Sequence, residues 1–360
     1  MARPSYRSID LAALVHNYKW ACSLAPKSKT MAVVKANAYG HGAVACASAL
    51  EPFAPAFGVA CIEEALELRQ AGIKKPIALL EGVFSADEVA VAAQQNFWTM
   101  VEDPSQVDAI LAAKVSKPLT VWIKVDTGMH RLGFRPDLLS QYFQQLSQSE
   151  NVAPGIVMAT HFACADDTQS EFTQSQLTCF RESVKPFEAA CSLANSPAIM
   201  AWPDTHADWN RAGFMLYGTS PLDVDHPSSK GLKPVMQMSS AITSLRTIEA
   251  GEGVGYAQTW IATRPSVIAT VAIGYGDGYP RNAVSGTPVL VNGKRASLAG
   301  RVSMDMISLD VTDLEDVKIG DPVCLWGNQL NVNEVASYAS TIGYELMTRV
   351  TGRLPLKYTQ

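Results

Sequence analysis

A lysine at the end of an apolar run is the first residue whose type and setting suit covalent chemistry. Lys35 follows the run TMAVV and precedes a polar, glycine-containing loop, ANAYGHG. In a barrel of alternating strands and helices, the carboxyl ends of the strands carry the active site. A lysine desolvated at that end keeps more of its amine uncharged and can form a Schiff base with an aldehyde cofactor. A solvated lysine at a strand end is the commoner case, so other groups have to support this interpretation.

Further charged and polar side chains occur after other apolar runs in the same half of the chain. The segments are KVDTGMHRLG, MATHFA, LANSP and WNRAGF, and their residues are Asp126, His130, Arg131, His161, Asn195, Ser196 and Arg211. The ends of parallel strands in a barrel meet at one rim, so these groups are expected to converge there. Such convergence predicts a site rather than scattered surface charges.

A glycine-rich corner in the second half of the chain holds another candidate. The segment VAIGYGDGYPR places Tyr275 directly after an apolar strand. Glycines in such corners usually serve backbone geometry alone. The segment also resembles a phosphate loop, but no amphipathic helix follows it, so dinucleotide binding is not predicted.

The hydrophobic pattern indicates which elements position these groups. From about residue 30 to residue 220, short apolar runs alternate with amphipathic segments, as in β-α units around a parallel sheet. Candidate strands cover residues 30–36, 57–61, 76–81, 97–101, 119–125 and 155–161, and candidate helices cover residues 62–72, 85–95, 104–114 and 176–194. Six or more such units predict an α/β fold with an N-terminal (β/α)8 TIM barrel.

After a polar connector, SPLDVDHPSSKGLKP, the pattern changes to short alternating runs separated by glycine and proline. This change predicts a barrel domain over residues 1–231 and a mainly β domain over residues 232–360, with which the first few residues could pair. The tripeptide NGK between two apolar runs predicts a hairpin turn.

Composition limits the classes of partner. The 360 residues are 48% hydrophobic and carry a formal net charge of −5, which gives no general attraction to nucleic acid or anionic lipid. We expect no metal site, because seven scattered cysteines never form a C-x-x-C pair. The N-terminus lacks a signal-peptide pattern and no apolar run reaches about 18 residues, so we expect a cytoplasmic protein outside the membrane.

With VVKANAYGHG and GYGDGYPR together, the chain resembles the bacterial alanine racemases. These are pyridoxal-phosphate enzymes of fold type III that combine a barrel with a β domain. The resemblance extends over essentially the whole chain, and it implies that Lys35 holds the cofactor covalently. It implies cofactor contacts from Tyr39, His161, Ser196, Arg211, Gly213 and Phe214. In such an enzyme Arg211 faces the pyridine nitrogen and does not readily give up a proton, and His161 orients it.

The resemblance also implies how substrate is held. Arg131 would lie near the substrate carboxylate, as would Met304 and Asp305 of the segment GRVSMDM. Lys124 matches a lysine that is often carbamylated in the family, with the new negative charge holding the arginine. An unmodified Lys124 paired with an acidic neighbour is the alternative from the residues alone.

Racemisation needs a proton removed from one face of Cα and another delivered to the opposite face. By the resemblance, Lys35 serves one face and Tyr275 of a second copy serves the other, so the enzyme is a homodimer with shared active sites. The implied reaction interconverts L-alanine and D-alanine and supplies D-alanine for peptidoglycan. The remaining alternatives are a racemase that also accepts serine and a fold type III decarboxylase.

One position departs from the family pattern. Gly352 stands where some relatives carry a tyrosine that contacts the cofactor phosphate and narrows the pocket. We therefore expect Gly352 to widen the pocket and to leave substrate size less strictly selected.

Overall fold

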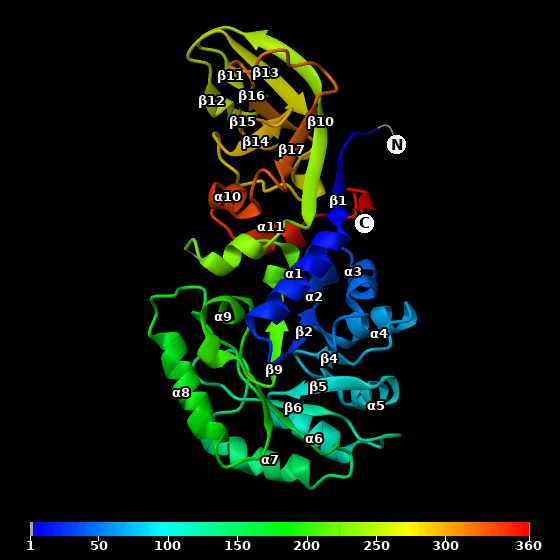
Figure 1. Ribbon diagram of the computed structural model, residues 1–360. Helices are drawn as coiled ribbons and strands as arrows, with labels where there is room; N and C mark the ends of the chain where they lie inside the picture. The colour runs from blue at the N-terminus through cyan, green and yellow to red at the C-terminus, as the bar shows by residue number, and fades with distance from the viewer. Residues whose placement is uncertain (1–2, 223, 360) are drawn as a thin grey trace.

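Eight short parallel strands close into a barrel in the computed structural model, which describes residues 3–222 and 224–359 (Figure 1). In barrel order they are β2 (Lys29–Val33), β3 (Phe57–Val59), β4 (Ile77–Leu79), β5 (Phe97–Val101), β6 (Val121–Lys124), β7 (Val157–Ala159), β8 (Ala190–Ser192) and β9 (Trp209–Ala212). β9 pairs with β2 and completes the ring. The predicted fold class, a (β/α)8 barrel followed by a mainly β domain, is confirmed.

The six candidate strands all exist, although most of them are shorter than predicted. The predicted helix over residues 176–194 is wrong beyond residue 184, because α8 (Phe172–Val184) ends at that residue and β8 follows. Pro186 explains the error: proline disfavours helical backbone at the residue before it and cannot donate a helical hydrogen bond. The last two barrel strands, β8 and β9, were not among the candidates.

The helices of the barrel alternate with its strands and surround them (Figure 1). They are α1 (Leu11–Leu24), α3 (Ala43–Leu50), α4 (Ile62–Gln70), α5 (Ala86–Gln95), α6 (Pro104–Ala112), α7 (Leu139–Ser147), α8 and α9 (Ser196–Ala201). Side chains cap several of them: Asp103 accepts from Ser105 N at the start of α6, and Asn195 accepts from Ala198 N at the start of α9. These caps satisfy peptide N–H groups that have no partner within a helix.

The segment after β2 is a left-handed turn. In α2 (Lys35–Gly40), residues 36–39 have φ between 51° and 53°, a conformation that costs a non-glycine residue roughly 1–2 kcal/mol. Hydrogen bonds offset this strain: the buried His41 donates from Nδ1 to the carbonyls of Ala38 and Tyr39, both at 2.9 Å. The turn is therefore stabilised by its own side chains and neighbours, not by helix propensity.

The second domain is a β structure whose strands pair mostly antiparallel. The sheet order is β13-β16-β15-β14-β17-β10-β1-β18, and β10 also pairs with β13, so six of these strands form a closed circuit of pairings. The bounds are β1 (Tyr6–Asp10), β10 (Met236–Ile248), β13 (Ser266–Val271), β14 (Pro288–Val291), β15 (Lys294–Leu298), β16 (Ile307–Asp310), β17 (Pro322–Trp326) and β18 (Leu356–Thr359). Smaller elements are β11 (Gly253–Val254), β12 (Trp260–Ile261), α10 (Val332–Ser337) and α11 (Gly343–Thr348).

The predicted hairpin joins β14 to β15. Asn292 and Gly293 connect them with φ values of 51° and 78°, the left-handed pair that a two-residue hairpin turn requires.

The ends of the chain belong to the β domain. β1 pairs antiparallel with β10 and parallel with β18, and Figure 1 shows these strands side by side where the two domains meet. From β1 the chain passes directly into α1 of the barrel, so the two domains are joined at α1 as well as at β10.

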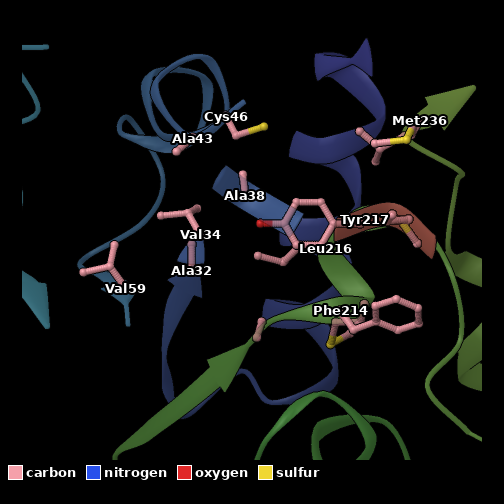
Figure 2. Packing of buried hydrophobic residues seen from close by; sticks show 14 of the residues in the cluster. Ala32, Val34, Ala38, Ala43, Cys46, Val59, Phe214, Leu216, Tyr217 and Met236 are labelled. Carbon is pink, nitrogen blue, oxygen red and sulfur yellow. The ribbon is translucent and has the colours of Figure 1, made fainter. Parts of the chain in front are cut away.

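A continuous apolar core packs against α2 (Figure 2). Its centre is Tyr217, which is 1% exposed and whose hydroxyl points toward β2 and donates to the Val33 carbonyl at 2.9 Å. Ala38 of the left-handed turn and Met236 of β10 belong to the same cluster. The strained turn is thus packed against both domains.

A separate cluster fills the interior of the barrel. It contains Trp122 and Trp209, with Trp98 packed against them. Met100 belongs to this cluster and also lines the large cavity described below, so the cluster and the cavity adjoin at Met100.

None of the helices in the described residues has the length and apolar character needed to cross a membrane, and no three His, Cys, Asp or Glu side chains among these residues are grouped as metal ligands. The cytoplasmic location stays a prediction.

Candidate active site

A cavity of about 720 Å³ opens at the carboxyl ends of the barrel strands. Its walls come mainly from the segments that follow β2, β6, β7, β8 and β9, together with α11 of the β domain. Ten predicted site residues line it: Lys35, Tyr39, Lys124, Arg131, His161, Asn195, Ser196, Arg211, Gly213 and Phe214. The structure therefore brings most of the sequence candidates into one site.

Lys35 lies two residues beyond the end of β2, at the first position of α2, and not in the strand as predicted. It is half-buried and lines the cavity. Among the described residues, no group accepts a hydrogen bond or forms an ion pair with its amine. The left-handed turn after it also brings Tyr39 to the cavity wall, so the anchor and a hydroxyl come from one short segment.

A cradle of hydrogen-bonding groups surrounds Gly213. A Cβ at this position would lie 2.8 Å from the Tyr39 hydroxyl, so only glycine allows the tyrosine to approach so closely. The Ser196 hydroxyl accepts from the Gly213 N–H at 2.9 Å. Phe214 begins the 3₁₀ turn η3 (Phe214–Tyr217), where the first N–H groups have no partner within the turn. Two hydroxyls and peptide N–H groups at one point fit a phosphate.

Arg211 is a buried cation whose partners are neutral. Its guanidinium donates to the carbonyls of Ser192, Thr160 and Leu193 and to the Ser192 hydroxyl, at 2.6 to 3.1 Å. Burial lowers its pKa to about 10, which still leaves it charged at neutral pH. A buried guanidinium bonded to neutral acceptors is suited to an electron-rich ligand in the cavity.

His161 is neutral in this setting. Burial lowers its pKa well below the usual value, and the positive charges of Arg211, Lys124, Arg131 and Lys35 lower it further. Its Nδ1 lies 3.3 Å from an Arg211 nitrogen and, being next to a cation, accepts that hydrogen bond. His161 therefore helps to fix Arg211, as expected from the resemblance.

Lys124 pairs with a carboxylate that the sequence interpretation did not name. Its Nζ lies 3.0 Å from Oε2 of Glu102, which follows β5, and both side chains are buried. Burial raises the pKa of Glu102 and lowers that of Lys124, while the opposite charge of each partner offsets part of the shift. The ion pair is the alternative that the residues alone had left open for Lys124.

Asp126 and His130, which were also predicted at the barrel rim, contact each other within the loop between β6 and η1 (Pro136–Leu138). Asp126 accepts from the peptide N–H groups of Gly128 and His130 and pairs with the His130 ring at 2.9 Å. His130 is exposed, and neither residue lines the cavity. Of this segment, only Arg131 does, together with its neighbour Leu132.

The candidates of the β domain lie outside this cavity. Tyr275 begins the 3₁₀ turn η6 (Tyr275–Asp277) and is 37% exposed, and Met304 is 53% exposed. The Asp305 carboxylate pairs with Arg353 at 2.5 Å. The three residues thus lie on one exposed corner and do not line the cavity of their own chain.

The role expected for Gly352 stays a prediction. Gly352 is exposed, a Cβ built on it would meet no atom within 4 Å, and it does not line the cavity. The tyrosine at the cavity wall is Tyr344 of α11, which stacks on Phe214 at a centroid distance of 3.6 Å and lies 6.2 Å from the Tyr39 ring. Nothing local in the sequence marks Tyr344, because it reaches the cavity only through the packing of α11 against α2.

Comparison with known proteins decides the family. Residues 9–221 match the family described as alanine racemase, N-terminal domain, and residues 235–358 match alanine racemase, C-terminal domain. An alanine racemase of Chromohalobacter salexigens is 50% identical over 358 residues, which are 99% of this chain and 98% of that protein. The chain belongs to the alanine racemase family.

Solved structures agree with this membership. Biosynthetic alanine racemase from Pseudomonas aeruginosa superposes with a TM-score of 0.97 at 47% identity, over 99% of this chain and 100% of that chain. Alanine racemase from Bartonella henselae, solved with covalently bound pyridoxal phosphate, gives a TM-score of 0.89 at 31% identity over 99% of each chain. The barrel and the β domain are therefore arranged here as in those structures.

Proposed function

We propose that this chain is a pyridoxal-phosphate-dependent isomerase that interconverts L-alanine and D-alanine. One observation carries the proposal: the free amine of Lys35, the cradle around Gly213 and the buried Arg211 guanidinium line the same cavity. These are an anchor for an aldehyde, a seat for a phosphate and a cation for a ring nitrogen. Family membership and the covalently bound cofactor of the Bartonella relative support the same assignment.

The cavity residues have distinct tasks. Pyridoxal phosphate, when bound, withdraws electrons from the amino acid and makes its Cα proton acidic. Tyr39 and Ser196 would hold the phosphate, with the N–H groups of Gly213 and Phe214. Arg211 keeps its own proton, because even with its pKa lowered to about 10 it remains a cation at neutral pH. It therefore offers the cofactor a hydrogen bond without protonating it, which favours proton return over transamination.

Substrate binding falls to the basic side of the cavity. Arg131 lies there with Lys124, and a cation is the natural partner of an amino-acid carboxylate. Met304 and Asp305 would complete this side from a second subunit, because in their own chain they lie outside the cavity. The cavity would then bind a small amino acid between the barrel rim and a partner's β domain.

Two bases on opposite faces of Cα complete the reaction. Lys35 would move the proton on one face, and Tyr275 of the partner subunit would move it on the other. The tyrosines of the cavity itself are poor bases, because burial raises the pKa of Tyr39 to about 12 and raises that of Tyr344 as well. Tyr275 is exposed, and the Arg281 guanidinium lies 6.0 Å from its ring centre.

A homodimer with shared sites follows from the same placement. One chain supplies Lys35 in the cavity and presents Tyr275 on a corner outside it, so each chain would hold half of two sites. The proposed role in the cell is supply of D-alanine for peptidoglycan. The chemistry itself runs in both directions.

The test is racemisation by the purified protein with added pyridoxal phosphate. We expect L-alanine to yield D-alanine, and the reverse, with solvent deuterium entering at Cα, all followed by chiral chromatography and mass spectrometry. L-serine should react more slowly, and release of CO2 should be absent. Decarboxylation without racemisation would overturn the proposal, and faster turnover of lysine or arginine than of alanine would make the chain a broad-specificity racemase.

A further inference from the structure

The basic side of the cavity is built on a buried ion pair whose geometry comes from the barrel. β5 and β6 run parallel with Val101 beside Ile123, so Glu102 and Lys124 occupy the next paired position of the two strands. Glu102 is 5% exposed and Lys124 is 8% exposed, and Oε2 accepts from Nζ at 3.0 Å. Strand register fixes the two side chains beside each other.

The other oxygen of Glu102 is unpaired. Oε1 is buried and has no hydrogen-bond partner among the residues that the structure describes. A buried carboxylate oxygen without a partner costs free energy, so such an atom calls for an explanation. Arg131 lines the same cavity as Lys124, and no described residue forms an ion pair or hydrogen bond with its guanidinium, so it is the cation available to approach this oxygen. Its charge also lowers the pKa of Glu102 against the effect of burial.

The ion pair opposes chemical modification of Lys124. Carbamylation requires a neutral amine to attack CO2, forms an N–C bond, releases a proton and leaves an anion on the lysine. Glu102 favours the ammonium form at 3.0 Å, and it would stand beside a second buried anion after the reaction. Both the reactant and the product of carbamylation are therefore disfavoured by the same carboxylate.

We propose that Glu102 is the anion of the basic side of the cavity: it keeps Lys124 unmodified and, through Oε1, positions Arg131 for the substrate carboxylate. Glu102 does not line the cavity, so it is a positioning residue that acts through its two basic neighbours. The chain thus encodes a negative charge that a carbamate would otherwise supply, and its activity is independent of dissolved CO2. Only the substrate step of this inference rests on the proposed function.

The state of Lys124 can be read without an activity assay. We expect no carbamate signal in the ¹³C NMR spectrum of the wild-type holoenzyme equilibrated with ¹³C-bicarbonate. Lys124→Met gives the matched background spectrum. A carbamate signal in the wild type that Lys124→Met removes would overturn the inference, whether or not the chain racemises alanine. Absence of racemisation with a silent spectrum would instead overturn only the proposed function.

Glu102→Gln tests the positioning role. The amide keeps the shape but loses the charge, so Arg131 loses its anchor and KM for L-alanine should rise about tenfold with much less change in kcat. Bicarbonate should lower KM again in this variant and have no effect on the wild type, because the neutral amide no longer opposes carbamylation. Glu102→Asp keeps the charge, and its KM should lie between the two even if Glu102→Gln folds poorly.

Glu81→Gln is the matched control, since Glu81 lines the same cavity but does not pair with Lys124. It should show no bicarbonate dependence. A wild-type KM in Glu102→Gln would contradict the positioning role, and equal bicarbonate dependence in both glutamine variants would show that the cavity's total charge, not Glu102, matters.

Discussion

The cavity of the barrel and the Tyr275 corner of the β domain hold their reactive groups in different ways. In the cavity, Arg211 and Ser196 are buried and held by hydrogen bonds from their own chain. On the corner, Tyr275 and Met304 are 37% and 53% exposed. The first region is lined by buried groups of one chain, whereas the second presents its groups on a surface outside that chain's own cavity.

Exposure does not make the corner loose. The Asp277 carboxylate is buried, receives two hydrogen bonds from Arg3 at 2.5 and 2.6 Å, and accepts from the Gly274 N–H at 3.0 Å. The Tyr275 N–H donates to the Ser303 carbonyl at 3.0 Å. The comparison therefore teaches that a group can be fixed in direction by its own chain and still lie on an exposed surface, as the proposed contact with a second chain requires.

Removing the anchor of the cavity should have the largest effect. Lys35→Ala should lower kcat/KM for alanine by at least about 10⁴-fold in both directions, because both the covalent anchor and one base are lost. The visible absorbance of the bound cofactor should change to that of the free aldehyde. Lys29→Ala, at the other end of β2, is the control and should keep that absorbance. A covalent adduct that persists on another lysine of the Lys35→Ala protein would contradict the assignment.

Mixing two inactive variants tests whether the two regions meet across subunits. Tyr275→Phe should lose proton transfer on one face and keep the cofactor. After exchange with Lys35→Ala subunits, half of the dimers are mixed and each has one intact site, so about a quarter of the wild-type rate should return. Mixing Tyr275→Phe with wild-type protein calibrates the exchange. No recovery despite exchange proven by mass spectrometry would argue that each site lies within one chain.

Loosening the corner without touching Tyr275 should have a smaller effect. Asp277→Asn removes the charge that Arg3 and Arg353 share, so the tyrosine should be held less accurately and kcat should fall about tenfold. The cofactor absorbance should stay that of the wild type, since the cavity is unchanged. Arg264→Ala, which breaks an exposed ion pair with Asp313 in the same domain, should leave kcat within about twofold. Equal losses in the two variants would remove the special role of Asp277.

The last expected effect concerns the stability of the fold against acid and leaves the activity at neutral pH unchanged. Burial lowers the pKa of His41 from 6.5 to about 4. Between pH 6.5 and pH 4 the His41 side chain is protonated in the unfolded chain but neutral in the folded chain. The free energy of unfolding therefore falls as pH falls through this window. At pH 4 the loss from this residue should be about 3 kcal/mol relative to neutral pH. Chemical denaturation of the wild type and of His41→Gln between pH 7 and pH 4 should show a shallower decline in the variant, and parallel curves would contradict the assignment.

Much of the cavity was predictable because its residues follow apolar runs. His161 is the last residue of the candidate strand over residues 155–161 and lies two residues beyond the end of β7. Arg211 lies in β9, which was not predicted as a strand, but Arg211 itself was named as a candidate. Ser196 was named from the polar end of the segment LANSP, and the resemblance added its cofactor contact; the local reason for its position is the capped start of α9. For such residues, the linear order of apolar and polar segments already contains the geometry.

The rest of the cavity depends on contacts between distant segments. Tyr344 reaches it because α11 packs on α2, about 300 residues away in sequence, and no periodicity reports such packing. Glu102 had a signal, an acid directly after a predicted strand, but only strand register shows that it faces Lys124. Gly352 was named from the family pattern alone, and in this chain it lies in open space and does not line the cavity.

The pairing of β1 with β10 and β18 has a consequence for synthesis on the ribosome. β1 is synthesised before its two partners, so it can pair with β10 and β18 only after those later strands have been made. The barrel strands between them can close earlier, since domains generally fold as units and N-terminal ones first. Arg3, which clamps the Tyr275 corner through Asp277, precedes β1 and can take its place only when that sheet forms. A nascent chain can therefore close its barrel before α11 completes the cavity wall and before the sheet that fixes the Tyr275 corner has formed.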